Sequence, residues 1–260
     1  MELNGRSADP EALKALALTN YGHFTTLRVE DGRVRGLALH LERLARDCRA
    51  VFGAELDLDR VRACLARAAG GGGSIAVRVT VFDPGLDLGH PAGPADPHIL
   101  VTTRPAGTLP LPPLRVKTVS YVRDAPAVKH TGLFGTLHAR RAAQLAGFDD
   151  ALFTGPGGLV TEGGTWNVGF VDADGAVVWP EAEVLPGVTM ALLRRHHPCV
   201  EAPLEVSDLG TMRAAFATNA AIGVRAIAGV DELGFATDDV VLEQLSAAYA
   251  AVPGEALANL

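Results

Sequence analysis

The sequence predicts an α+β fold, in which hairpins form the sheets and helices pack outside them. Turn signals such as Asp31-Gly32 separate strand-like apolar segments, and other segments place apolar residues at helical spacing. With 260 residues, 48% of them apolar, the chain is long enough to bury a sizeable core without metals or disulfides. A doubly wound parallel sheet fits this alternation of patterns less well.

Residues 1–115 are expected to form a smaller N-terminal α/β unit. Asp9 has the character of a helix N-cap, and Pro10 follows at the first helical position. Residues 40–52 place apolar side chains on one helical face, and Gly53 follows as the stop. The other elements predicted here are a strand and turn at 2–5, strands at 22–30, 75–82, 98–103 and 114–122, a helix at 58–69 and a loop at 83–97.

Residues 122–260 are expected to form a larger unit, joined to the first by a linker at about 116–121. Helices are predicted over 131–146, after Pro186-Gly187, after Ser207-Asp208 and over 238–251. The predicted strands are 151–154, 159–161, 166–172, 176–179 and 224–230, with hairpin turns at 155–158 and 173–175.

Charge and composition exclude several classes of function. A net charge of −7 argues against general binding to nucleic acid or to an anionic membrane. No apolar run is long enough to span a membrane, and the N-terminus shows no secretory signal. The three cysteines are odd in number and widely spaced, which favours reduced thiols in a cytoplasmic protein. No zinc or other metal motif is present, so no metal is expected.

One lysine stands out as a candidate nucleophile. Only three of the 23 basic residues are lysines, namely Lys14, Lys117 and Lys129. Lys129 follows an apolar residue and precedes a predicted helix, and desolvation there would favour the neutral, nucleophilic amine. The residues alone leave open the commoner case of a solvated surface lysine.

Candidate partners for an anion and for a buried cation occur in other segments. Val188 and Thr189 begin a predicted helix, where free N–H groups bind phosphate, and Asn219-Ala220 lies in a similar turn of small residues. Arg43 lies one turn after His40 on the first amphipathic helix, although a solvated helix face is the alternative. Glu162 precedes Gly-Gly and an apolar strand; a buried acid there needs a cationic partner, and a turn-facing glutamate is the favoured alternative.

Taken in order, these motifs resemble a known family. The strings NYGHFTTLRVEDGRV and HLERL, then Lys129, TEGGTWNVGF and LPGVT, resemble the class IV (fold-type IV) pyridoxal-phosphate enzymes. These include branched-chain aminotransferases, D-amino-acid transaminases and aminodeoxychorismate lyase. The resemblance covers nearly the whole chain and implies two α/β subdomains with the cofactor, pyridoxal 5'-phosphate, between them.

The resemblance also implies a role for each matching residue. Lys129 matches the catalytic lysine that forms the aldimine with the cofactor and moves the substrate proton. Glu162 matches the acid that pairs with the pyridine nitrogen. Phosphate binding is implied for a further group of matching residues: Arg43, Val188, Thr189, Asn219 and Ala220. Tyr21 matches a tyrosine that faces the substrate.

Departures from the family pattern leave the substrate open. Phe134 occupies the position where several members have a tyrosine that bonds the cofactor's phenolic oxygen. The loop after residue 82 lacks the Arg-Gly-Tyr type sequence that helps hold substrate carboxylates, and His23 replaces a common acidic residue. The candidates for contact with the substrate are Tyr21, Phe134, Arg78 and Arg104, with Arg123 and His98 as further groups that could hold a carboxylate.

An aminotransferase acting on an amino acid and a 2-keto acid is the leading hypothesis. The phrase Phe24-Thr-Thr-x-Arg-Val and the pair Lys129-His130 look closer to aminodeoxychorismate lyase, so an elimination that releases pyruvate is the alternative. A scaffold of this fold without catalysis is a third reading, which the joint presence of Lys129, Glu162 and Arg43 disfavours. The resemblance also implies a homodimer.

Overall fold

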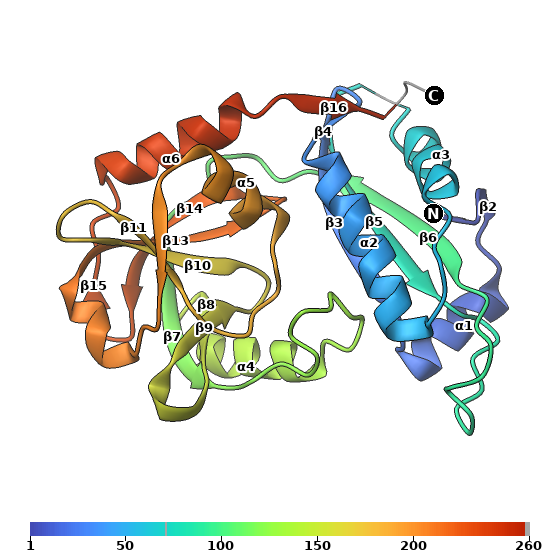
Figure 1. Cartoon of the computed structure of the whole chain (residues 1–260), viewed down its shortest axis with the longest axis horizontal. Coiled ribbons are helices and arrows are strands. Elements are labelled where there is room, and N and C mark those ends of the chain that lie inside the picture. Colours follow the sequence, from blue (N-terminus) through green and yellow to red (C-terminus); the bar gives the residue numbers. More distant parts are fainter. Residues whose placement is uncertain (71, 258–260) are drawn as a thin grey trace. The chain divides into compact units, whose positions relative to one another are not determined.

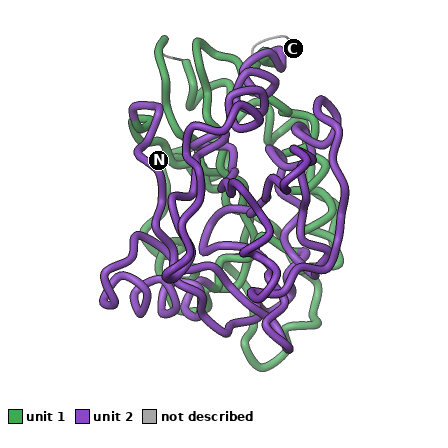
Figure 2. The backbone as a smooth tube through the Cα atoms, turned by 90° about the vertical axis from the view of Figure 1, so that its left-hand side faces the viewer, with its two compact units in different colours: residues 1–107, 128–132, 254–260 green, residues 108–127, 133–253 purple. Residues whose placement is uncertain are grey.

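The structure is a computed structural model that describes residues 1–70 and 72–257. It contains both sheets and helices, which confirms the α+β expectation. The chain divides into two compact units (Figure 2). Unit 1 is formed by residues 1–107, 128–132 and those from Gly254 onward, and unit 2 by residues 108–127 and 133–253.

Unit 1 is built on an antiparallel sheet with the strand order β16-β4-β3-β5-β6-β1-β2. Its long central strands pair over their full lengths, so that Phe24 lies opposite Thr80 and Arg78 lies between Thr26 and Thr102. The strands are β1 (Glu2–Leu3), β2 (Arg6–Ser7), β3 (His23–Glu30), β4 (Arg33–Arg35), β5 (Ser74–Phe82), β6 (His98–Pro105) and β16 (Gly254–Ala256).

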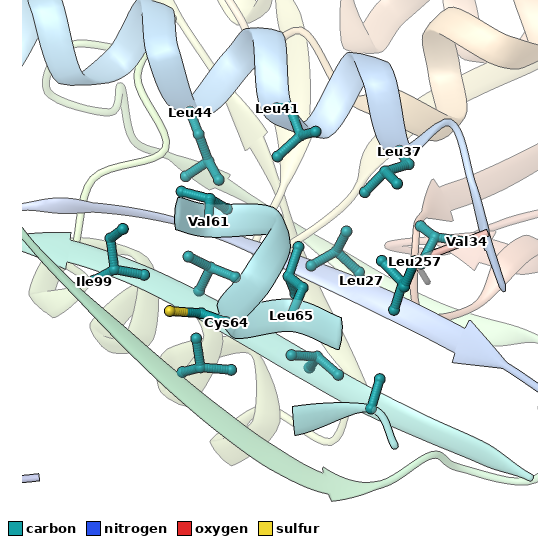
Figure 3. Close-up of a cluster of buried hydrophobic side chains, with 14 of the residues drawn as sticks. Leu27, Val34, Leu37, Leu41, Leu44, Val61, Cys64, Leu65, Ile99 and Leu257 are labelled. Carbon is teal, nitrogen blue, oxygen red and sulfur yellow. The ribbon is translucent and has the colours of Figure 1, made fainter. Parts of the chain in front are cut away.

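The core of unit 1 lies between one face of this sheet and two amphipathic helices, α2 (Leu37–Phe52) and α3 (Leu58–Ala68). Figure 3 shows Leu37, Leu41 and Leu44 pointing from α2 toward Leu27 and the residues of α3. As predicted, α2 ends at Gly53, whose φ of 62° is a left-handed conformation that glycine adopts at low cost. Helix α1 (Pro10–Thr19) begins at Asp9, whose side chain accepts a hydrogen bond from the Glu11 amide as an N-cap.

Unit 2 contains a sheet that closes on itself within the described residues. Its strand order is β12-β11-β10-β13-β14-β7-β8-β9, and β9 also pairs with β10 through Glu162 and Asn167 (Figure 1). This pairing closes a ring of strands, and it fixes Glu162 beside the first residue of β10. The strands are β7 (Leu114–Ser120), β8 (Asp150–Thr154), β9 (Val160–Gly163), β10 (Asn167–Asp172), β11 (Val177–Pro180), β12 (Cys199–Ala202), β13 (Met212–Asn219), β14 (Gly223–Val230) and β15 (Leu233–Gly234).

Three α-helices, α4 (Phe134–Leu145), α5 (Val188–His196) and α6 (Val240–Ala251), accompany the unit 2 sheet. The helix expected after Ser207-Asp208 was wrong in kind: residues 206–211 form a short 3-10 helix, and residues 212–219 form β13. The strand forms because it pairs with β10 on one side and with β14 on the other. This long-range pairing overrides the local start signal.

The units are not divided where the sequence suggests. The expected linker at 116–121 is largely β7, which pairs with β14 and β8 inside the unit 2 sheet. Residues 128–132 belong to unit 1, because Phe24 donates its backbone N–H to Lys129 O at 2.8 Å and Thr131 donates to Gly22 O at 2.9 Å. The segment that carries the candidate nucleophile is therefore fixed by hydrogen bonds to residues more than 100 positions earlier.

Candidate active site

Lys129 lies in unit 1, beside the start of β3. Its backbone C=O accepts from Phe24 N, and its own N–H donates to Asp47 Oδ2 at 3.0 Å. The Nζ atom lies 5.0 Å from the centre of the Phe24 ring, a cation–π distance. Unlike a freely solvated surface lysine, Lys129 is partly buried and held by its backbone on both sides.

A buried polar chain in unit 1 contains Arg43, Thr25 and His40. Arg43 Nη2 donates to Thr25 Oγ1 at 2.7 Å, and Thr25 Oγ1 lies 2.7 Å from His40 Nδ1. Burial lowers the pKa of His40 well below its ordinary value, aided by the charges of Arg43 and Lys129. A neutral imidazole has one donor and one acceptor nitrogen, and the Thr25 hydroxyl can accept from Arg43 and also hydrogen-bond to His40 Nδ1 in either tautomer.

Arg43 has a buried hydrogen-bond donor that the described residues do not use. Its side chain is 7% exposed, and its Nε has no hydrogen-bond partner among the described residues. Burial lowers the pKa of the guanidinium to about 10, partly opposed by Asp47, so the group remains charged at neutral pH. A buried cation with an unused donor is suited to an anionic ligand such as a phosphate.

The sequence-predicted substrate residues of unit 1 differ in how well they are placed. Arg78 stacks on the Phe24 ring, with its guanidinium carbon 3.6 Å from the ring centre, and its Nε donates to Thr80 Oγ1 at 3.2 Å. Arg104 is exposed on β6. Tyr21 is 41% exposed, and its hydroxyl donates to Val51 O at 3.0 Å. Of these residues, Arg78 shares its aromatic neighbour with Lys129.

In unit 2, Glu162 is buried and has a cationic partner. Arg123 Nη1 donates to Glu162 Oε1 at 2.9 Å, and the backbone N–H of Leu185 donates to Oε2 at 3.3 Å. Asn167, opposite Glu162 in the sheet, donates from Nδ2 to Leu185 O at 2.8 Å. Glu162 is therefore buried and does not face a turn. Arg123, which was a candidate for holding a substrate carboxylate, forms an ion pair with Glu162 instead.

Val188 and Thr189 form the first turn of α5, as predicted. This helix begins at Gly187 without a capping side chain, so its first amides lack partners within the helix. Thr189 is 1% exposed, and its Oγ1 has no hydrogen-bond partner among the described residues. A Cβ at Gly187 would collide with Asn167 Oδ1, so glycine is required for this close approach. The turn presents unused donors of the kind that hold an anion.

The remaining predicted residues of unit 2 are Asn219, Ala220 and Phe134. Asn219 ends β13, and its Oδ1 accepts from the amides of Ala221 and Ile222 at 2.9 and 3.1 Å, which shapes the turn that contains Ala220. Phe134 begins α4, is 82% exposed and stacks on His138. Its ring has no hydrogen-bonding group, so it contributes no donor of the kind that the family tyrosine supplies.

Residues 22–230 match the family described as Amino-transferase class IV. The chain belongs to this family. The match confirms the resemblance noted in the sequence, and pyridoxal phosphate is the cofactor of this class of enzymes. No curated protein sequence matches the chain.

Solved structures of the family share the fold of the chain. A branched-chain aminotransferase from Thermoproteus uzoniensis, solved with norvaline, superposes with a TM-score of 0.82 at 20% identity, covering 96% of this chain and 92% of that one. A hypothetical aminotransferase from Mycobacterium tuberculosis in a PLP-bound form gives 0.77 at 21% identity, covering 91% and 90%. A putative 4-amino-4-deoxychorismate lyase from Legionella pneumophila gives 0.73 at 22% identity, covering 88% and 90%.

The residues present in each unit fit pyridoxal phosphate. In unit 1, Arg43 Nε is a buried donor without a partner in the described residues, as is Thr189 Oγ1 in unit 2, and unused donors of this kind suit a phosphate. Glu162 is a buried acid of the kind that pairs with a ring nitrogen, and Lys129 is a partly buried amine. Residues 1–70 and 72–257 contain no cluster of metal ligands and no helix long and apolar enough to cross a membrane.

Two contacts of the candidate site residues were not predicted from the sequence. Asp47 contacts Lys129 across 82 positions of the chain, and Arg123 was not identified as the partner of Glu162 across 39. A signal for Asp47 did exist: His40, Arg43 and Asp47 are spaced as neighbours on one side of α2, next to its apolar stripe. No comparable local signal links Arg123 to Glu162.

Proposed function

We propose that this chain is an aminotransferase that moves an amino group between an amino acid and a 2-keto acid, with Lys129 as its catalytic lysine. The observation that carries the proposal is the placement of Lys129. Its backbone is fixed to β3 and α2, and its Nζ faces the ring on which Arg78 also stacks. In this proposal Lys129 serves the amino group of the substrate, and Arg78 binds its carboxylate.

Bound pyridoxal phosphate supplies an electron-withdrawing ring that stabilises negative charge developing on the substrate α-carbon. Lys129 Nζ would hold the cofactor covalently and would move the proton at the substrate α-carbon. Glu162, held by Arg123 and the Leu185 amide, would keep the ring nitrogen protonated. We assign the phosphate contacts that the resemblance implies to Arg43 in unit 1 and to a group of residues in unit 2: Val188, Thr189, Asn219 and Ala220.

On the substrate side, we assign the main contact to Arg78. Its guanidinium is partly buried, and among residues 1–70 and 72–257 no carboxylate forms an ion pair with it. Tyr21, Arg104 and Phe134 are retained as weaker candidates, since each is exposed. We also infer a homodimer, the assembly implied by the resemblance.

A lyase reaction that releases pyruvate is the second candidate. It is favoured by the Lys129-His130 pair and by the fold shared with the putative 4-amino-4-deoxychorismate lyase. Two structural neighbours favour the transferase: the Thermoproteus structure contains norvaline, and a Mycobacterium tuberculosis structure contains alpha-ketoglutarate and PMP. Both reactions require the same lysine, so the substrates consumed and the products released distinguish them.

Absorbance spectra of the chain loaded with pyridoxal phosphate test this proposal. We expect a visible band in the wild type that the Lys129→Ala variant lacks, and bleaching of that band by a panel of L- and D-amino acids. A band that no amino acid bleaches, together with pyruvate release from aminodeoxychorismate without a keto acid, would establish the lyase instead. No band in the wild type would refute both, and a Lys117→Ala variant controls for loss of an unrelated lysine.

A further inference from the structure

Asp47 is a buried carboxylate in the middle of α2 that the proposed reaction does not use. The residue is 0% exposed, whereas its ion-pair partner Arg46 has a side chain that is 46% exposed. Arg46 donates from Nε and Nη2 to Asp47 Oδ1 at 3.1 and 2.7 Å. Burying a carboxylate is costly, so the position requires an explanation beyond an ion pair at the surface.

The explanation lies at the other carboxylate oxygen. Asp47 Oδ2 accepts the backbone N–H of Lys129 at 3.0 Å. Other hydrogen bonds between residues 128–132 and the rest of unit 1 end on backbone atoms: Phe24 N to Lys129 O, Thr131 N to Gly22 O, and Thr131 Oγ1 to Asn20 O and Gly22 O. The Asp47 contact differs from these because its acceptor is a side chain of helix α2.

The need for such an anchor follows from the path of the chain. Residues 128–132 belong to unit 1, while the residues on both sides of them belong to unit 2. A backbone N–H in such a segment needs a hydrogen-bond partner where water does not reach it, and leaving it unpaired would destabilise the segment. The Asp47 bond supplies that partner at the residue whose side chain reacts.

We propose that Asp47 is a positioning residue for Lys129: its carboxylate binds the lysine backbone amide and thereby fixes the position from which Nζ reaches the Phe24 face. Asp47 shares α2 with Arg43, one turn earlier, and lies near His23. Helix α2 thus carries both Arg43, which we assign to the phosphate, and Asp47, which binds the backbone of the catalytic lysine. The inference rests on the proposed role of Lys129 and adds the residue that holds it.

Amide hydrogen exchange of the cofactor-free chain, read by mass spectrometry on the peptide containing Lys129, tests the anchor directly. Asp47→Leu keeps the size of the side chain but removes the acceptor, and we expect the Lys129 amide to exchange at least ~10-fold faster. Asp47→Asn retains one acceptor oxygen and should rescue most of the protection. If the leucine variant does not fold, Asp47→Ser, which is polar but too short to reach, replaces it.

Asp83 provides a matched control in the same unit. It is a buried aspartate that accepts the backbone amides of Gly85 and Asp96 at 2.8 and 3.0 Å. Asp83→Leu should accelerate exchange in the loop it anchors and leave the Lys129 peptide unchanged. Equal acceleration at Lys129 in the Asp83 variant, or unchanged exchange in Asp47→Leu, would overturn the proposal.

A second measurement separates positioning from general destabilisation. When pyridoxal phosphate is added, the visible band that depends on Lys129 should form about 10-fold more slowly in Asp47→Leu than in the wild type, with recovery in Asp47→Asn. A normal rate in Asp47→Leu contradicts the proposal. If the wild type forms no band, the proposed function fails, while the exchange result still decides whether Asp47 anchors the segment.

Discussion

Arg123 and Glu162 form a buried ion pair in unit 2, with Arg123 Nη1 2.9 Å from Glu162 Oε1 and side chains that are 10% and 7% exposed. The carboxylate belongs to β9, and the guanidinium to the segment after β7. The second oxygen of Glu162 accepts the Leu185 amide. The acid assigned to the cofactor ring is therefore held in one orientation by the protein itself.

Removing one partner of this pair should cost more stability than removing both. In the cofactor-free chain, Arg123→Met leaves a buried carboxylate without its cation, and we expect a loss of about 3 kcal/mol in the free energy of unfolding. The double variant Arg123→Met/Glu162→Gln should recover about 2 kcal/mol of this loss, because the uncompensated charge is gone. Urea denaturation of the wild type, both single variants and the double variant measures the coupling, and strict additivity would contradict it.

His23 should make the chain sensitive to mild acid. Burial lowers its pKa from 6.5 to about 4, against a raising effect of Asp47, and both ring nitrogens lack partners among the described residues. Between these two pKa values the unfolded chain binds more protons at this residue than the folded chain, so stability falls as the pH falls from about 6.5 to 4. Below pH 4, this loss in the free energy of unfolding reaches about 3 kcal/mol.

The His23→Gln variant isolates the contribution of His23 to the pH dependence of stability, because the other buried histidine, His40, remains in both proteins. Unfolding free energies at pH 7 and at pH 4.5 should differ more in the wild type than in the variant. Identical pH dependence in the two proteins would show that His23 is not neutral in the fold.

Thr189 offers a test that separates ligand binding from folding. Its buried hydroxyl has no partner in the described residues, so Thr189→Val should leave the cofactor-free chain equally stable or up to about 1 kcal/mol more stable. Affinity for pyridoxal phosphate should fall about 5- to 10-fold, because one phosphate hydrogen bond is lost. Spectroscopic titration gives the affinity and urea denaturation the stability; a loss of stability without a loss of affinity would assign the hydroxyl to the fold.

Local signals predicted helix boundaries correctly where the deciding contacts are local. The Asp9 cap and the Gly53 stop depend on backbone geometry within one turn, and both are present. The helix expected after Ser207-Asp208 was wrong because residues 212–219 form a strand that pairs with β10 and β14, which no local pattern indicates. The division of the chain failed for the same reason, since β7 and the Lys129 segment are placed by distant partners.

The candidate site divides in the same way. Lys129, Arg43 and Thr189 were identified because each lies within a short motif of the family, and the structure places each with an amine, a donor or a hydroxyl suited to the cofactor. Asp47 and Arg123 act through contacts across long stretches of chain. The spacing of Arg43 and Asp47 indicates that they share one side of a helix, but it does not show that Asp47 contacts Lys129 or that Arg123 pairs with Glu162. Those contacts required the three-dimensional structure.

Arg43 should act on the phosphate of the cofactor rather than on its ring. Since its pKa of about 10 leaves it charged at pH 7, Arg43→Gln removes a buried cation and a charge-assisted hydrogen bond. We expect pyridoxal phosphate to bind about 100-fold more weakly and pyridoxal, which lacks the phosphate, to bind unchanged. Arg49→Gln, which removes an exposed arginine of the same helix that pairs with Glu55, serves as the control, and equal losses for both ligands would contradict a phosphate role.

Arg78 should determine how the substrate carboxylate is bound. Its guanidinium stacks on Phe24 at 3.6 Å, and Lys129 Nζ lies 5.0 Å from the centre of the same ring, so both side chains lie beside Phe24. Burial lowers the pKa of Arg78, which is the expected cost of holding a cation without a carboxylate partner until a substrate arrives.

For Arg78→Gln, we expect kcat/KM for amino acids to fall about 10- to 100-fold, mainly through KM, because a charge-assisted hydrogen bond to the ground state and the transition state is lost. Amines without a carboxylate should react equally well with both proteins. Arg28 is the matched control: it lies opposite Ala76, on the same sheet face as Arg78, and forms an ion pair with Glu30. An equal loss in Arg28→Gln, or an equal loss for amines, would show that Arg78 supports the sheet rather than the substrate.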